Sequence, residues 1–173
     1  MELHQIQKDL HRVFTDLYQS LDSYSDSDFL SKKDESTWSL GQMYEHISSA
    51  SKKFFLANVQ RCIDQRKGQD GGEMTEYGIG MYKLGSFPDM KIKIPKVFGE
   101  PEIIPQAKEQ YKIEIKEILQ GVDAMTAQVE LASETYKVAH PVLGYLNAKE
   151  WFQNLEMHTR HHLKQKAELE SYL

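Results

Sequence analysis

Four long stretches of the chain place apolar residues three and four positions apart, which is the spacing of a helix that buries one face. The first covers residues 3–22, the second residues 39–66, and the third runs from Pro105 to about residue 132. The fourth begins at Asn147 and continues to the last residue of the sequence without a glycine or a proline. The pattern predicts four long amphipathic helices in one domain, which we expect to span residues 1–173.

Polar residues at the predicted helix starts support these boundaries. Ser39 is followed three residues later by Gln42, and Asn147 is followed by Glu150. Both pairs match the capping box, in which side chain and backbone bond reciprocally at the start of a helix. Pro105 suits the first turn of the third helix, because an amide hydrogen would have no partner there. The sequence therefore predicts helix starts at Ser39, Pro105 and Asn147.

The connections between the predicted helices differ in length. Residues 23–34 are rich in serine and aspartate and form a connector with room for a short helical turn near Phe29. Residues 67–104 hold most of the glycines and prolines, and a connection of this length is unusual in a helical domain and is often functional. Residues 133–146 are turn-rich. These lengths predict an all-α fold, a four-helix bundle with a long Gly/Pro-rich connection between its second and third helices.

The long connection carries residues that bear on function. The segment Met90–Ile94 alternates apolar and basic residues, which is typical of a short extended segment. Four lysines make the connection locally basic, either as a solvated surface or as a rim that attracts an anionic substrate. These lysines are Lys83, Lys91, Lys93 and Lys96. Three aromatic residues could cover the mouth of a pocket: Tyr77, Tyr82 and Phe87.

The apolar stripe of the fourth helix is interrupted by His158, His162 and Gln165. Buried polar side chains need partners, because an unpaired one costs about 1–3 kcal/mol. Two histidines four residues apart lie on one face of a helix and can direct a nitrogen at one atom, and a metal ion is a common choice. The alternative is a pair of core histidines satisfied by carboxylates, carbonyls or water. His46 borders the apolar face of the second helix and is either a boundary residue or a third ligand.

Charge and cysteine content narrow the class of protein. The formal net charge is −5, which argues against nucleic acid as the main partner, because phosphate binding needs a basic surface. A single cysteine, Cys62, excludes an intramolecular disulfide and fits a reducing compartment. The first residues lack the apolar core of a signal peptide, and no apolar run is long enough to span a bilayer. We therefore expect a soluble cytoplasmic protein that binds no membrane.

Three motifs taken together resemble the DinB/YfiT-like superfamily, and the resemblance covers essentially the whole chain. The stretch WSLGQMYEH, residues 38–46, is similar to the tryptophan-serine stretch before that superfamily's first metal ligand. The stretch HPVLGYLNAKEWF, residues 140–152, is similar to its lead into the last helix, and HTRHHLKQ, residues 158–165, to its closing motif. The resemblance implies an up-down-down-up four-helix bundle, a homodimer, and a divalent metal ion bound by His46, His158 and His162.

The resemblance also implies roles for the neighbours of these histidines. Gln165 matches the glutamine of the closing motif and could steady a ligand or a bound water, and Asn154 could act in the same way. His161 is an extra histidine about 100° around the helix from His162, which makes it a neighbour or a surface residue. We do not expect Cys62 to be a nucleophile, because it lies about 24 Å along the second helix from His46.

The expected chemistry follows from a site with three histidines. Such a site leaves positions open for water or substrate, and imidazole suits several metals, of which we expect zinc or nickel. Relatives in the superfamily use bacillithiol, mycothiol or glutathione, so we expect a metal-dependent thiol S-transferase, or a hydrolase, acting on a small molecule. Glu150 and Glu156 fall off the histidine stripe, and the lack of a general base weakens the hydrolase reading. The alternative is a non-catalytic metal-containing stress-response or binding protein.

Overall fold

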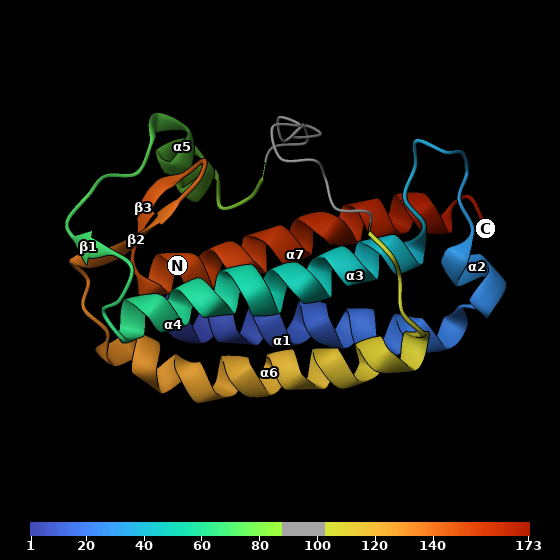
Figure 1. Ribbon diagram of the computed structural model, residues 1–173, viewed down its shortest axis with the longest axis horizontal. Helices are drawn as coiled ribbons and strands as arrows, with labels where there is room; N and C mark the ends of the chain where they lie inside the picture. Colours follow the sequence, from blue (N-terminus) through green and yellow to red (C-terminus); the bar gives the residue numbers. More distant parts are fainter. Residues whose placement is uncertain (88–102) are drawn as a thin grey trace.

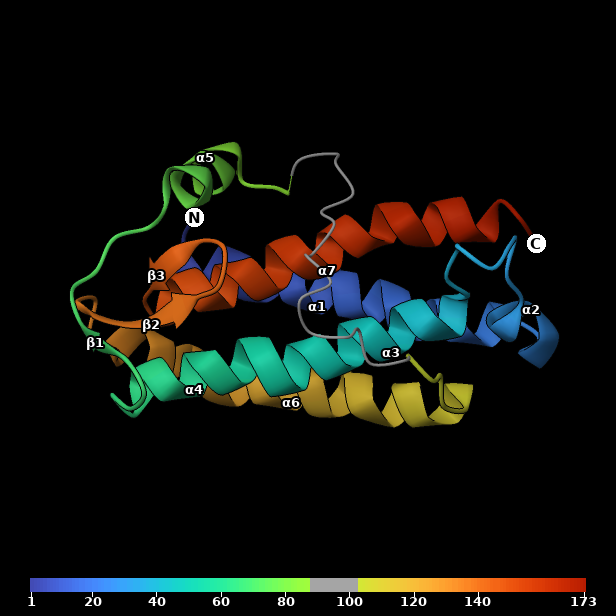
Figure 2. The same cartoon turned by 45° about the horizontal axis from the view of Figure 1, so that its top comes forward.

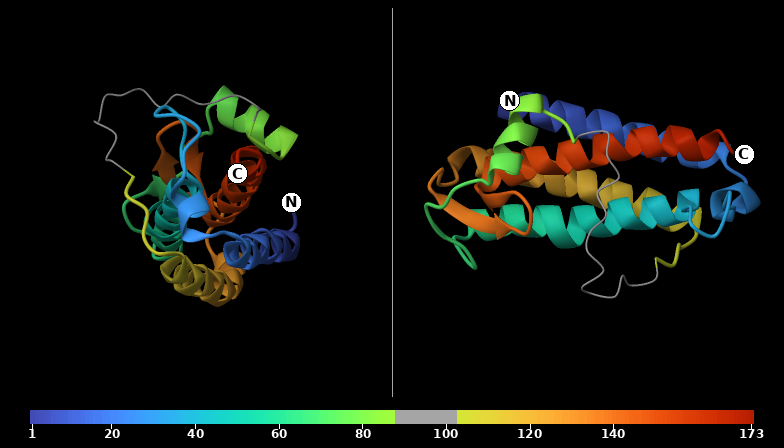
Figure 3. Two further views of the ribbon diagram at one scale, coloured as in Figure 1. Left: turned by 90° about the vertical axis from the view of Figure 1, so that its right-hand side faces the viewer. Right: turned by 90° about the horizontal axis from the view of Figure 1, so that it is seen from above.

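The computed structural model describes residues 1–87 and 103–173, and long helices dominate it. The four long segments are α1 (Leu3–Ser20), α3 (Leu40–Ala50) with its continuation, α6 (Lys108–Leu131) and α7 (Ala148–Glu170). They lie side by side along the length of the molecule and surround a common interior when viewed from the end (Figures 1 and 3). The prediction of a mainly α-helical protein is confirmed.

The long helices run in two directions. Figures 1 and 2 show α1 and α7 running one way, from the end near the N-terminus to the end near the C-terminus, while the other two run the opposite way. The connector after α1 contains a 3₁₀ turn, η1 (Leu21–Ser23), and the short helix α2 (Asp26–Leu30), which matches the helical turn expected near Phe29. The chain crosses the end of the molecule through α2 before it enters α3.

The interior of the bundle is formed by the apolar faces that the helical spacing predicts. On α1 the buried residues are Ile6, Leu10, Val13, Phe14 and Leu17. On α6 they are Tyr111, Ile115, Ile118, Val122 and Val129. Trp151, Phe152 and Leu155 of α7 are fully buried in the same core. Burial of such side chains stabilises the fold by roughly 1.5–3 kcal/mol each, which explains why the helices assemble around this stripe.

Two predicted helix starts are confirmed and one is wrong. Ser39 and Gln42 form a capping box at α3, and Asn147 and Glu150 form one at α7. The third helix does not begin at Pro105, because α6 starts at Lys108. Pro105 instead packs against α3, since a Cβ atom added to Gly41 would lie 2.8 Å from the Pro105 Cβ. Pro105 therefore lies at a close contact between two segments and does not start a helix.

The second long helix differs from the continuous α-helix expected over residues 39–66. After α3 the chain forms a π-helical segment, η2 (Ser51–Leu56), and then α4 (Ala57–Ile63). A π-helix bonds each amide to the carbonyl five residues earlier, so its turns are wider, and such segments are frequent at functional sites. The wider turn changes which side chains of this helix face the interior.

Residues 64–87, which follow α4, contain more secondary structure than the sequence indicated. They contain the strand β1 (Gln69–Asp70) and the helix α5 (Glu76–Leu84), which is capped by Thr75. The turn-rich stretch before α7 contains β2 (Tyr136–His140) and β3 (Gly144–Leu146), and the three strands form an antiparallel sheet in the order β1-β2-β3. The predicted extended segment Met90–Ile94, with Lys91, Lys93 and Lys96, lies outside the described residues.

The sheet and α5 cover one end of α7 (Figure 2). The Thr75 amide donates to the Leu143 carbonyl over 2.9 Å, which ties the start of α5 to the β2–β3 hairpin. The Tyr82 hydroxyl donates to the Glu150 carbonyl over 2.6 Å, which ties α5 to the first turn of α7. The residues that follow α5, Ser86 and Phe87, line a small pocket together with Met157 and His161 of α7.

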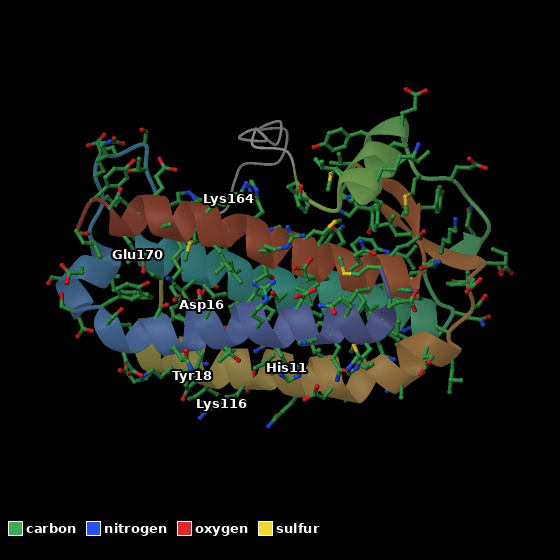
Figure 4. The ribbon with its side chains drawn as sticks, turned by 180° about the vertical axis from the view of Figure 1, so that it is seen from behind. His11, Asp16, Tyr18, Lys116, Lys164 and Glu170 are labelled. Carbon is green, nitrogen blue, oxygen red and sulfur yellow. The ribbon has the colours of Figure 1, made fainter. Side chains whose placement is uncertain are left out.

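Polar side chains make contacts on the face formed by α1, α6 and α7, which Figure 4 shows from behind. The Lys116 ammonium of α6 lies 5.3 Å from the ring centroid of Tyr18 on α1, and His11 Nε2 lies 2.7 Å from a carboxylate oxygen of Asp123. These contacts are exposed and contribute little to stability.

Within residues 1–87 and 103–173, no helix has both the length and the apolar content that crossing a membrane requires.

Candidate metal centre

Three histidine rings meet between α3 and α7 in the middle of the bundle. His158 Nε2 lies 3.1 Å from His46 Nε2 and 3.2 Å from His162 Nε2. One possible ligand atom from each residue lies within 4.8 Å of the other two, so the cluster could hold a metal ion. The structure thus brings together the three residues that were predicted as ligands, although His46 is 112 positions away from His158 in the sequence.

Local structure explains how the rings meet. The capping box at Ser39 fixes the start of α3, and His46 follows two turns later on the side that faces α7. His158 and His162 are four residues apart on α7, so they lie one above the other on a single face. The ring of Trp38, which precedes the cap, lies 5.2 Å from the His46 ring and limits the space in which that ring can turn.

Burial lowers the pKa of each of the three imidazoles, because a charged ring is poorly solvated inside the bundle. It brings the pKa of His46 to about 4 and, together with the neighbouring His46, the pKa of His162 to about 3. Burial, with smaller effects of the surrounding histidines, holds the pKa of His158 well below 6.5. All three rings are therefore neutral at pH 7, and each can offer a nitrogen lone pair.

The two predicted supporting residues lie on α7 on either side of the ligand pair. Gln165 Oε1 accepts a hydrogen bond from His162 Nδ1 over 2.7 Å, which leaves the His162 Nε2 lone pair directed at the other two rings. Asn154 is wholly buried one turn before His158. Within the described part of the chain, both polar atoms of the Asn154 side chain and His158 Nδ1 lack a hydrogen-bond partner.

Aromatic rings surround the histidines. The Phe55 ring from η2 lies 4.8 Å from the His158 ring, and the Phe87 ring lies 6.2 Å from it. Phe87 also lies 5.7 Å from His161, a half-buried residue whose ring is 5.6 Å from His162. Of the two alternatives for His161, the structure shows the neighbour, and of the three aromatic residues proposed for a pocket mouth Phe87 lies beside these histidines. Phe55 was not identified from the sequence, because its direction depends on the π-helical segment.

His140 occupies a second aromatic cluster next to these rings. Its ring lies 5.1 Å from Trp151 and 5.4 Å from Phe54. His140 Nδ1 accepts hydrogen bonds from the backbone amides of Val142 and Leu143, both over 3.1 Å. Burial lowers the pKa of His140 to about 4, so this ring is also neutral at pH 7. The sequence placed His140 only in a turn, and no local signal indicated that it would border the site.

The other reactive residues are engaged elsewhere. Cys62 is buried, its thiol donates to the Leu146 carbonyl, and burial raises its pKa to about 12, so the thiolate is absent at pH 7. The carboxylate of Glu150 caps α7 by accepting from the Asn147 amide, and Glu156 is buried in an ion pair with Arg160. These contacts agree with the expectation that neither glutamate is a general base for the histidine cluster.

Comparison with protein families identifies one match that spans most of the chain. A family model described as the DinB superfamily matches residues 7–165, a range that includes the three histidines and Gln165. Among curated proteins no match to the chain is found.

Proposed function

The chain belongs to the DinB superfamily, as the resemblance of its motifs predicted, and on this premise we propose that it binds a divalent metal ion through His46, His158 and His162. The opposite directions of the two pairs of long helices support the up-down-down-up four-helix bundle that the family implies (Figure 1). In such bundles, metal sites are built inside from side chains on facing helices. Here α3 supplies one ligand and α7 supplies two.

The convergence of three neutral imidazole nitrogens carries this proposal. Two nitrogens bound to one zinc ion in tetrahedral geometry lie about 3.3 Å apart, and the two measured Nε2–Nε2 distances are 3.1 and 3.2 Å. The hydrogen bond from His162 Nδ1 to Gln165 leaves a lone pair on His162 Nε2. At this distance either a shared hydrogen or a cation lies between two such nitrogens, and a single ion could serve all three rings. The donor set suits several metals, and we propose zinc or nickel.

We further propose that the protein is a metal-dependent enzyme. A divalent ion held by three histidines leaves coordination positions open and would favour the deprotonated form of a thiol or of water. The chain contributes neutral ligand rings, a glutamine that orients His162, and the apolar rings of Phe55 and Phe87 beside His158. Thiol S-transfer ranks ahead of hydrolysis, because Glu150 and Glu156 are engaged elsewhere and attack by a bound thiolate needs no separate base.

A second function is a metal-containing stress-response or binding protein without turnover. The observation that favours it is the composition of the walls around the histidines, where Trp38, Phe55 and Phe87 supply no acid or base. Aromatic walls of this kind are as suitable for holding a bound ligand as for surrounding a reaction.

Several properties remain proposals that follow from the family or from composition. These are a single domain over residues 1–173, a homodimer, a cytoplasmic location, and a small-molecule substrate in place of nucleic acid or membrane. Light scattering at several concentrations would decide the oligomeric state, and titration with duplex DNA at low salt would decide the nucleic-acid question.

Elemental analysis of protein purified without an affinity tag or a chelator tests the metal site. We expect about one ion per chain in the natural protein, as in sites of this ligand set, and its loss from His46→Ala, His158→Ala and His162→Ala. A natural chain that takes up no metal after incubation with zinc or nickel would refute the proposal.

An assay with several thiols and a simple electrophile separates the two functions. We expect the metal-loaded protein to accelerate the reaction, and the His158→Ala variant to give the uncatalysed rate. Equal rates for the two proteins across all thiols would favour the binding protein over the enzyme.

A further inference from the structure

The described residues contain three buried side-chain polar atoms that lack a hydrogen-bond partner, and all three belong to one pair of residues. They are Asn154 Nδ2, Asn154 Oδ1 and His158 Nδ1. Buried polar groups in folded proteins are nearly always paired, so each exception calls for an explanation. Because the two residues are one helical turn apart on α7, their side chains are neighbours on the same face.

The fold alone does not explain an asparagine at this position. Asn154 lies in the interior of α7, seven residues after its cap, where asparagine is a poorer helix former than leucine. The side chain is wholly buried, as are the nearby Trp151 and Leu155, and a leucine there would remove two of the three unpaired polar atoms. An asparagine in this place therefore points to a partner within the site.

The protonation of the three rings identifies that partner. His158 Nε2 faces the Nε2 atoms of both other histidines, so it must present a lone pair if the three rings share one ion. A neutral imidazole with a lone pair on Nε2 carries its hydrogen on Nδ1. That hydrogen needs an acceptor, and the amide oxygen of Asn154 is the unpaired acceptor one turn away.

We propose that Asn154 is a positioning residue that accepts the Nδ1 hydrogen of His158 and thereby holds this ring in the tautomer that binds metal. The proposal rests on the metal site proposed above. It gives His158 the same kind of support that Gln165 already gives His162, whose Nδ1 donates to an amide oxygen over 2.7 Å. Two amide side chains, one before and one after the ligand pair, would then fix the two rings on α7.

Zinc affinity, measured by competition with a coloured chelator, tests the proposal without a substrate. The variant Asn154→Leu keeps the volume and removes the acceptor, and we expect its affinity to fall by about 10–100-fold, the usual effect of losing such a partner. Asn154→Asp keeps an acceptor and should bind zinc at least as tightly as the natural chain. The matched control is Asn58→Leu, which removes another buried asparagine, on α4, whose amide donates to the Phe54 carbonyl.

Undiminished zinc affinity in Asn154→Leu would overturn the proposal, and so would an equal loss in Asn154→Asp or in the Asn58 control. Nitrogen NMR of histidine-labelled, metal-free protein provides a readout that does not depend on metal. We expect His158 to carry its hydrogen on Nδ1 in the natural chain and to become a mixture of tautomers in Asn154→Leu. A natural chain that binds no zinc refutes the metal site, whereas an unchanged tautomer in Asn154→Leu refutes the role of Asn154.

Discussion

Acidification from pH 7 to pH 5 is expected to destabilise the metal-free protein through its buried histidines. Burial lowers the pKa of His46 and His140 to about 4 and that of His162 to about 3, whereas a histidine in an unfolded chain titrates near 6.5. At pH 7 the rings are neutral in the folded protein and mostly neutral in the unfolded chain. Below pH 6.5 the unfolded chain binds protons that the folded chain does not, so the free energy of unfolding falls as the pH falls.

The size of the effect follows from these values. For one histidine with a pKa of about 6.5 unfolded and about 4 folded, the loss of stability between pH 7 and pH 5 is about 2 kcal/mol. Three such residues lose about 6 kcal/mol, and His158 adds to this in the same direction because its pKa is also lowered. Typical domains have a total stability of about 5–15 kcal/mol, so the metal-free protein should be close to unfolding at pH 5.

Urea denaturation of chelator-treated protein at several pH values between 5 and 7 measures this loss. Replacement of His46 by glutamine removes one of the titrating groups, so the difference in stability between pH 7 and pH 5 should shrink by about 2 kcal/mol. Thr159→Val is the matched control, because Thr159 is a buried neighbour of His158 on α7 that does not titrate. It can change the stability but should leave the pH dependence as in the natural chain.

A loss of less than about 2 kcal/mol in the natural protein between pH 7 and pH 5, the amount expected from one histidine, would contradict this prediction. The same pH dependence in His46→Gln and Thr159→Val would contradict it as well. Either result would mean that the rings take up protons in the folded state as readily as in the unfolded chain.

Three further predictions concern residues outside the cluster. Arg160→Met should lower the free energy of unfolding in urea by roughly 3 kcal/mol, because it leaves the buried carboxylate of Glu156 without its partner; a loss below 1 kcal/mol would contradict this. Asn147→Ala should remove about 1 kcal/mol by breaking the capping box of α7, and an unchanged thermal midpoint would argue against the cap. Gly144→Ala should lower the free energy of unfolding by roughly 1–3 kcal/mol, because φ is 83° and the new Cβ would lie 2.5 Å from the Glu73 carbonyl oxygen. An unchanged thermal midpoint in calorimetry would mean that the backbone relaxes without strain.

The parts of the fold that local sequence determines were predictable. Helical spacing and the two capping boxes depend on residues within a few positions of each other, and they identified α1, α3 and α7 together with the starts of α3 and α7. Pro105 shows the limit of this reasoning. Its place next to Gly41 depends on contact between segments that are far apart in sequence, and a proline that fits a helix start fits such a contact equally well.

The sheet could not be predicted for a similar reason. β1 has two residues, and its partner β2 lies more than sixty positions later, with Gln69 opposite Lys137. Strands this short contain too few residues to show the alternation of apolar and polar positions that distinguishes a strand from a turn. The helix α5 was missed because it contains Gly78 and Gly80, which lower helix propensity, although Gly78 is needed where the backbone passes close to the Leu143 carbonyl.

Two of the three candidate ligands, His158 and His162, were visible in the sequence because they interrupt an otherwise apolar stripe. The walls of the candidate site were not, and the second long helix shows why. A regular α-helix predicts Ala50 and Phe54 on the buried face after Ile47, since steps of three and four alternate. In the structure those two residues are half-buried, and one series of buried residues continues at steps of four through the π-helical segment. Its members are Met43, Ile47, Ser51, Phe55 and Val59.

In an α-helix, four steps of four residues would turn the buried face by about 160°, because each residue advances 100°. In the structure α3, η2 and α4 all pack against α7, and η2 inserts a wider π-helical turn between Ile47 and Val59. The same turn directs Phe55 at the His158 ring, 4.8 Å away, and Phe54 at His140 and Trp151. The segment that keeps the core continuous is therefore also the segment that builds the aromatic wall of the histidine cluster. Buried residues at steps of four indicate a π-helical segment, but the sequence does not show which residues of this helix are buried.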